Sequence, residues 1–152
     1  MRTAIAAIVF SALSVGTPCL FAAPAGNTAP DPAVLAELQA KANVAEPRDR
    51  CFLYAKVVAE MTVLAGYQLN SGDSGKASAT LQAVQHYAQI VKDDVGNDSR
   101  RLKNAELLLQ QTSFRLRDIL QSASYDDRPP VEATLKQLDQ VQSQVMMQVF
   151  SK

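Results

Sequence analysis

The sequence has little of what most catalytic and metal sites are built from. Its 152 residues include one histidine, two cysteines, six glycines and no tryptophan. The single histidine, His86, excludes any site that needs two imidazoles, and the chain has no metal-ligand spacing and no glycine-rich phosphate loop. We therefore predict no catalytic, cofactor-binding or metal-binding residues, and no cofactor.

An excess of charge of either sign is also missing. The chain has 15 basic and 15 acidic side chains, for a formal net charge of zero. A protein whose main partner is nucleic acid or an anionic membrane normally carries a net positive charge, so we expect neither partner. Aromatic residues make up only 6% of the chain, whereas alanine, leucine, glutamine and valine are abundant. This composition favours helices over sheets in one globular domain.

The first residues have the features of an export signal. Arg2 precedes an apolar run over residues 4–15, and a helix break at 16–18 is followed by small residues. The run is shorter than the roughly 20 residues that a membrane span needs, which favours a cleaved signal over a retained anchor. We predict a signal peptide at residues 1–23, a flexible lead at 24–30 and a helical bundle domain at 31–152. The mature protein is then exported to the periplasm or the extracellular space and does not attach to the membrane.

The two cysteines differ in what they predict. Cys19 lies within the predicted signal, and Pro18 stands where a lipoprotein signal carries a small residue, which disfavours acylation. Removal of the signal leaves Cys51 as a single thiol in an oxidising compartment. Its place on an apolar helix stripe favours a buried, inert thiol. The alternatives are a disulfide between two chains and a nucleophile assisted by His86.

Apolar periodicity predicts helices along almost the whole mature chain. Residues 51–69 are apolar over such a wide arc that we expect them to form the central helix, with neighbours on at least two sides. Asp31 followed by Pro32 predicts the start of a first helix, and Pro47 the start of the central one. The expected helices cover about residues 31–45, 47–70, 76–95, 99–122 and 131–150.

These helices and their connections predict an all-α fold. We expect an up-and-down antiparallel bundle of four long helices plus the short N-terminal helix. The turn at residues 71–75, with two glycines, is the clearest in the chain. A tetratricopeptide-like helix pair around this turn is the alternative, but the helices are too long for that repeat and no second unit follows.

Four charged residues lie at unfavourable ends of the expected helices. Asp93 and Asp94 fall near a helix C-terminus, and Arg100 and Arg101 fall near the next N-terminus. Mutual pairing across the intervening turn is the expected relief, since exposed ion pairs form at little cost. The alternative is that Arg100 and Arg101, together with Lys103, bind an acidic partner.

Two apolar residues of the fourth expected helix lie off its main apolar seam. Leu107 and Phe114 are one heptad apart, with glutamines between them. They are either covered by a neighbouring helix or exposed as a surface for self-association or a protein partner. The central helix likewise carries Phe52, Lys56, Glu60, Val63 and Tyr67 on a stripe opposite its core, which we expect the short first helix to cover.

The sequence predicts an exported, soluble helical bundle that acts by protein binding or assembly and is not an enzyme. The residues of the candidate partner surface are Leu107, Phe114, Arg100 and Arg101. One alternative is a bundle that binds a small ligand, haem or a metal, in which His86 faces Met61, Met146 or Met147. A second alternative is a tetratricopeptide-like adaptor.

Overall fold

The computed structural model describes residues 28–96 and 100–151, and all regular secondary structure in this part of the chain is helical. This confirms the predicted all-α bundle. The predicted signal peptide and most of the predicted lead lie outside the described residues. The helices are α1 (Pro32–Val44), α2 (Pro47–Asn70), α3 (Ser74–Asp94), α4 (Leu102–Ser122) and α5 (Arg128–Phe150).

The first two helices begin where the sequence predicts. The side chain of Asp31 accepts a hydrogen bond from the backbone N–H of Ala33 at 2.9 Å, and Pro32 occupies the first turn of α1. Pro47 begins α2 in the same way. Proline fits here because the first N–H groups of a helix have no partner within the helix.

The last two helices begin at other residues than predicted. Arg101 has a left-handed backbone with φ of 56°, so α4 begins at Leu102 and not at residue 99. A residue with positive φ cannot continue a right-handed helix, so it sets the boundary. Helix α5 begins at Arg128, before the predicted residue 131, because both prolines that follow fit its first turn.

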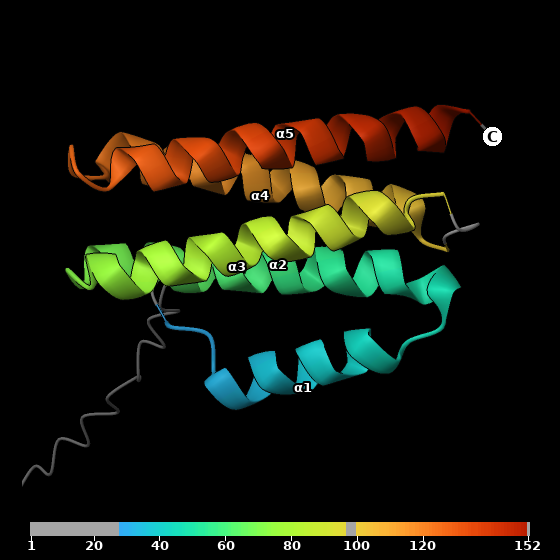
Figure 1. Ribbon diagram of the computed structural model, residues 1–152, viewed down its shortest axis with the longest axis horizontal. Coiled ribbons are helices and arrows are strands. Elements are labelled where there is room, and N and C mark those ends of the chain that lie inside the picture. Colours follow the sequence, from blue (N-terminus) through green and yellow to red (C-terminus); the bar gives the residue numbers. More distant parts are fainter. Residues whose placement is uncertain (1–27, 97–99, 152) are drawn as a thin grey trace, which may run out of the picture.

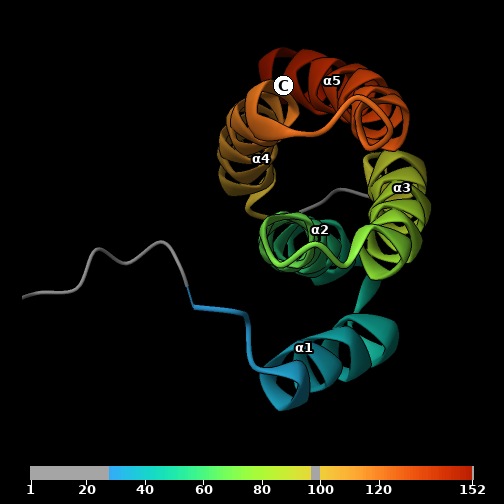
Figure 2. The ribbon, with the colours of Figure 1, turned by 90° about the vertical axis from the view of Figure 1, so that its left-hand side faces the viewer.

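Successive helices alternate in direction, as the colours along the chain in Figure 1 show. Helix α2 packs against α3 and α4, and α5 packs against the same two helices. Helices α3 and α4 are therefore diagonal, and the bundle is a stack of two hairpins in which α2 runs parallel to α4 and α3 parallel to α5 (Figures 1 and 2). The diagonal helices α3 and α4 are separated by seven residues in the sequence, against three between α2 and α3 and five between α4 and α5.

Helix α2 is the central helix, as predicted, because among the described helices it alone packs against three others. Cys51, Val57, Val58 and Ala65 are completely buried along it. At Gly66 the next helix comes so close that an added Cβ atom would lie 3.0 Å from Cδ1 of Ile119 in α4. The lack of a side chain at Gly66 therefore leaves room for the side chain of Ile119.

The short helix α1 covers one side of α2, as expected. The hydroxyl of Tyr54 donates to Oδ1 of Asn43 at 2.8 Å, and Nε2 of Gln39 lies 3.8 Å from the sulfur of Met61. Of the stripe that the first helix was expected to cover, Phe52 is only 8% exposed, whereas Tyr67 remains 45% exposed. The cations that lie over the Phe52 ring are Lys56 of α2 and Arg101, the residue before α4.

Candidate protein-association surface

The outer face of α4 exposes two large apolar residues. Leu107 is 51% exposed and Phe114 is 57% exposed, which confirms that they lie off the main apolar seam. Among the described helices α4 packs only against α2 and α5, and Figure 2 shows it at one side of the bundle, away from α1. The buried seam on the opposite side of α4 consists of Leu102, Ala105, Leu109, Thr112, Ser113 and Leu116.

The two exposed apolar residues belong to a regular row along α4. Positions 104, 107, 111, 114 and 118 follow one another at intervals of three and four, which places their side chains on one helix face. We call this row, Asn104, Leu107, Gln111, Phe114 and Asp118, the outer stripe. It has uncharged residues at its centre and an acid at one end.

Phe114 contacts an arginine that forms an ion pair between helices. The guanidinium carbon of Arg117 lies 5.4 Å from the centre of the Phe114 ring. Nη2 of Arg117 donates to Oδ2 of Asp139 in α5 at 2.9 Å and to Oδ1 at 3.0 Å. Both partners are about half exposed, so the pair contributes little to stability. Its larger effect is to restrain Arg117 and, through it, the ring, which lowers the entropy lost when the ring is covered.

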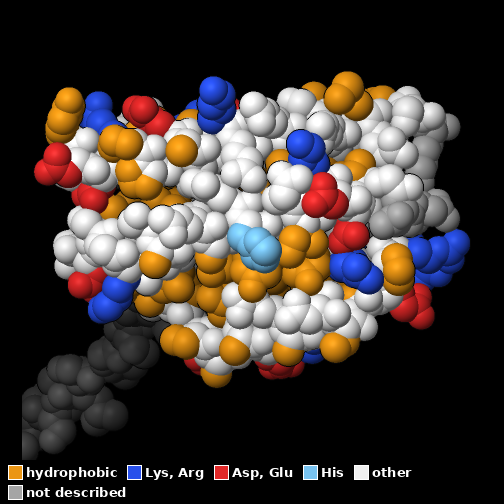
Figure 3. All heavy atoms as spheres, viewed as in Figure 1, with side chains coloured by type: hydrophobic (Ala, Val, Ile, Leu, Met, Phe, Trp, Pro, Cys, Tyr) orange, Lys and Arg blue, Asp and Glu red, His pale blue; other side chains and the backbone are white. Residues whose placement is uncertain are grey.

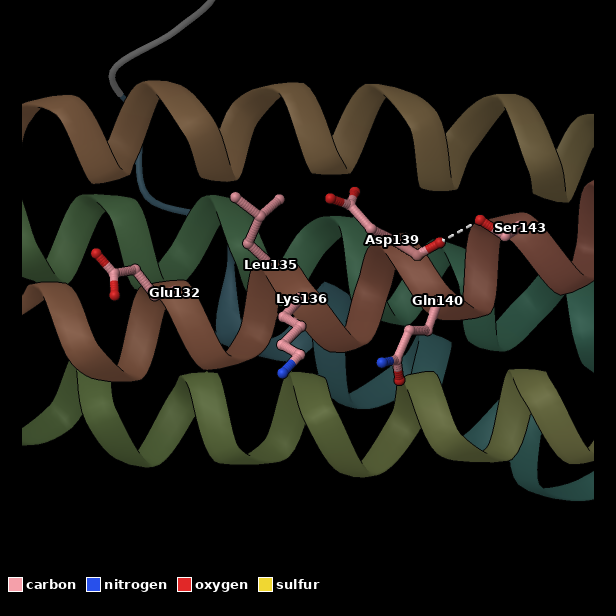
Figure 4. A pocket seen from close by; sticks show the side chains of 6 residues that line it. All are labelled: Glu132, Leu135, Lys136, Asp139, Gln140 and Ser143. Atoms are coloured by element: carbon pink, nitrogen blue, oxygen red, sulfur yellow. Dashed lines mark hydrogen bonds between the residues drawn. The ribbon is translucent and has the colours of Figure 1, made fainter.

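A shallow hollow of about 480 Å³ lies on α5 beside this pair. Asp139 belongs to both, so the surface continues from the Phe114 ring through Arg117 into the hollow. Figure 4 shows side chains of one helix pointing to its two sides, with the hydroxyl of Ser143 hydrogen-bonded to the backbone oxygen of Asp139 at 2.8 Å. The lining residues are Glu132, Leu135, Lys136, Asp139, Gln140 and Ser143.

The two arginines of the predicted partner surface lie elsewhere, at the start of α4. The backbone N–H of Arg100 donates to the backbone oxygen of Arg48 at 2.7 Å, which joins this segment to the start of α2. The guanidinium carbon of Arg101 lies 5.3 Å from the centre of the Phe52 ring. The amine of Lys56 lies over the same ring at 5.5 Å. These two cations cover Phe52, so Arg101 is directed towards α2 and not along the outer stripe.

The expected pairing of the acids with these arginines is wrong for the described residues. Oδ1 of Asp94 lies 3.9 Å from Nη1 of Arg50, and Oδ1 of Asp93 accepts a hydrogen bond from Nε2 of Gln89 at 2.9 Å. The reason is the fold: the end of α3 lies beside the start of α2, which brings Arg50 to Asp94. The sequence showed no sign of this contact.

A polar and aromatic cluster joins α1, α2 and α3 at the same end of the bundle. The rings of Tyr54 and Tyr87 stack with their centres 5.7 Å apart, and the Tyr54 hydroxyl donates to Asn43. Burial raises the pKa of Tyr54 above its usual value, and this outweighs the opposite effect of Arg50. Every polar contact of Tyr54 and Tyr87 that we find serves to hold helices together, so we interpret the cluster as structural.

The residues that suggested a thiol nucleophile or a haem do not converge. Cys51 is completely buried. His86 is exposed on α3, with its ring edge-on to Tyr87, and Figure 3 shows the histidine at the surface above a band of hydrophobic side chains. Gln85 bonds with Thr134 and Gln137 of α5, so Met146 lies about 14 Å further along that helix at 1.5 Å per residue. Within the described ranges no group of three His, Cys, Asp or Glu side chains is arranged to hold a metal.

A second hollow, of about 260 Å³, is lined by residues of α1, α2 and α4. Its apolar walls carry a charged rim on which Nζ of Lys41 lies 2.7 Å from Oε1 of Glu37. Both partners of this pair are well exposed, so the rim is solvated and mixed in sign. The lining residues are Val34, Glu37, Leu38, Lys41, Lys56, Ala59, Glu60 and Leu108.

Comparison with known proteins gives no family. The chain matches no protein-family model, and neither curated sequences nor solved structures include one that is significantly similar to it. None of the helices that the structure describes has the length and apolar content to cross a bilayer. The function therefore has to be argued from the surface of the molecule.

Proposed function

We propose that this protein is an exported, soluble helical bundle that binds another protein chain through the outer stripe of α4 and does not act as an enzyme. The observation that carries the proposal is the exposure of Leu107 and Phe114 on a helix face that no other described helix covers. Export rests on the signal-like features of residues 1–23.

The composition of this surface is typical of a binding surface. Interface centres are enriched in aromatic residues and arginine and depleted in lysine and acids. Phe114 and Arg117 supply the enriched types, and glutamines at 110 and 111 separate the two apolar residues. Because Asp139 restrains Arg117, the aromatic anchor is partly ordered before a partner arrives.

The alternative functions have less support. A haem held by His86 and Met146 would have to bridge about 14 Å along the bundle, and Met61 is buried with its sulfur towards Gln39 of α1. A tetratricopeptide-like adaptor would have to use α2 and α3, which are 24 and 21 residues long. The outer stripe, in contrast, is already formed on one face of a single helix.

Site-specific photo-cross-linking in cells that produce the protein tests the proposal. A benzophenone side chain replaces Phe114 in one variant and Ala79, an exposed residue of α3, in the control. We expect a protein adduct at position 114 that is missing at position 79 and that weakens when Leu107 is changed to serine. Equal adducts at both positions, or none at 114, would overturn the proposal.

A further inference from the structure

The partner that best fits the outer stripe is a second copy of this chain. We infer that two molecules pack antiparallel along α4, related by a two-fold axis that passes between Gln110 and Gln111. This inference rests on the proposed function and adds to it the identity of the partner and the geometry of the contact.

The spacing of the stripe makes it complementary to itself. With the axis between Gln110 and Gln111, Leu107 of one copy lies opposite Phe114 of the second copy, and the symmetry repeats this contact once more. The two apolar contacts lie on either side of a centre formed by glutamine amides, which are both donors and acceptors. A closed two-fold contact of this kind uses the same patch on both molecules.

Charge complementarity selects the antiparallel arrangement. The same axis places Lys103 of one copy at the level of Asp118 of the second copy. By symmetry, the dimer contains two such pairs. Both side chains are exposed, and neither forms an ion pair with another described residue. A parallel pair in register would instead place Lys103 against Lys103 and Asp118 against Asp118, which is repulsive at both ends.

The position of α4 in the bundle leaves room for this contact. Helix axes in contact lie about 8–10 Å apart. Helix α4 lies on one side of the bundle with α1 on another (Figure 2), so a second α4 can approach without meeting α1 first. The Arg117–Asp139 pair and the hollow of α5 then border the contact on one flank.

Sedimentation equilibrium of the purified protein at low salt tests the inference. We expect a dimer whose dissociation constant rises at least tenfold in Phe114→Ser. Lys103→Asp should raise it on the order of tenfold, because it replaces two attractive contacts by two repulsive ones. The double variant Lys103→Asp, Asp118→Lys should restore the wild-type value to within about threefold, as the swap restores opposite charges. Lys92→Asp, a control of equal charge change on α3, should have less than a twofold effect, about the level expected for charges far from the contact.

The outcomes separate this inference from the proposed function. Dimers that Phe114→Ser disrupts but the charge swap does not restore would overturn the antiparallel register. A protein that stays monomeric at the highest concentration reached would overturn the second copy as partner. In that case a cross-linked adduct of position 114 with a different protein leaves the proposed function intact, and the lack of any adduct there overturns both. Leu107→Gln provides a second apolar variant, and circular dichroism verifies that each variant is folded.

Discussion

Replacing Phe114 by serine should cost the isolated molecule about 1.5 kcal/mol of stability, less than the emptying of a core position costs. The side chain is 57% exposed, so about two-fifths of it is covered. Complete burial of a phenylalanine stabilises by roughly 1.5–3 kcal/mol, so the covered part is worth about 1 kcal/mol. Loss of the exposed contact with Arg117 adds about 0.5 kcal/mol. Serine and phenylalanine have similar helix propensities, so no further term arises from the backbone.

The matched control is Leu116→Ala, two residues further along the same helix. Leu116 is completely buried, and emptying such a position costs about 3–5 kcal/mol. With about 1.5 kcal/mol lost in Phe114→Ser, the free energies of unfolding of the two variants should differ by about 1.5–3.5 kcal/mol. Both substitutions lie in the middle of α4, so the difference between the two losses of unfolding free energy reflects burial and not the element that carries the residue.

Urea unfolding followed by circular dichroism measures both changes. The protein must be dilute, because association stabilises the native state by mass action and would add to the apparent effect of Phe114→Ser. A loss of more than about 3 kcal/mol for Phe114→Ser in dilute solution would show that this ring is part of the core, and the assignment of an outer stripe would be refuted. A loss below about 1 kcal/mol for Leu116→Ala would refute the assigned seam.

Three further predictions concern other parts of the fold. Gly72→Ala should destabilise the protein by about 1 kcal/mol in thermal unfolding, because φ at Gly72 is 79° and only glycine adopts this without strain. Tyr54→Phe should speed amide exchange in α1 by removing the bond to Asn43. The pKa of Tyr54 is raised in the folded protein, so the contribution of the neutral side chain to the free energy of unfolding is complete below the unfolded pKa and is lost as the pH rises through the folded pKa. Absorbance at 295 nm measures the ionisation of tyrosine. Tyr54→Phe should reduce the loss of stability at alkaline pH. A hydrogen bond from Ser124 lowers the pKa of Asp127, so Ser124→Ala should raise that pKa in an NMR titration; because the folded pKa then lies closer to the unfolded one, less stability should be lost as the pH falls through these two values.

The helices, and the position of Leu107 and Phe114 off the buried seam of α4, were predictable from the sequence. The interval of seven between them places both on one helix face away from the seam, but the sequence left open whether a neighbouring helix covers that face. Local chemistry likewise predicted the start of α1, since the cap at Asp31 and the proline act within one turn.

What the sequence did not predict depends on contacts between distant segments. Periodicity shows which face of a helix is apolar but not which helix covers it, so the diagonal placement of α3 and α4 was not accessible. That Arg101 lies over the Phe52 ring was not predictable, because Arg101 is far along the chain from it. The pairing of Asp94 with Arg50 was missed for the same reason.

Hydroxyl-radical footprinting tests most directly whether the outer stripe of α4 is an association surface. Oxidation of Phe114 is compared between dilute purified protein and the protein in its native surroundings, with the fully exposed Tyr125 as a site that should not change and the buried Phe52 as a check on folding. We predict that Phe114 is oxidised readily in the dilute protein and is protected several-fold in native surroundings, as expected for an anchor buried by a partner, while Tyr125 reacts equally in both. Equal oxidation of Phe114 in the two conditions would contradict the account.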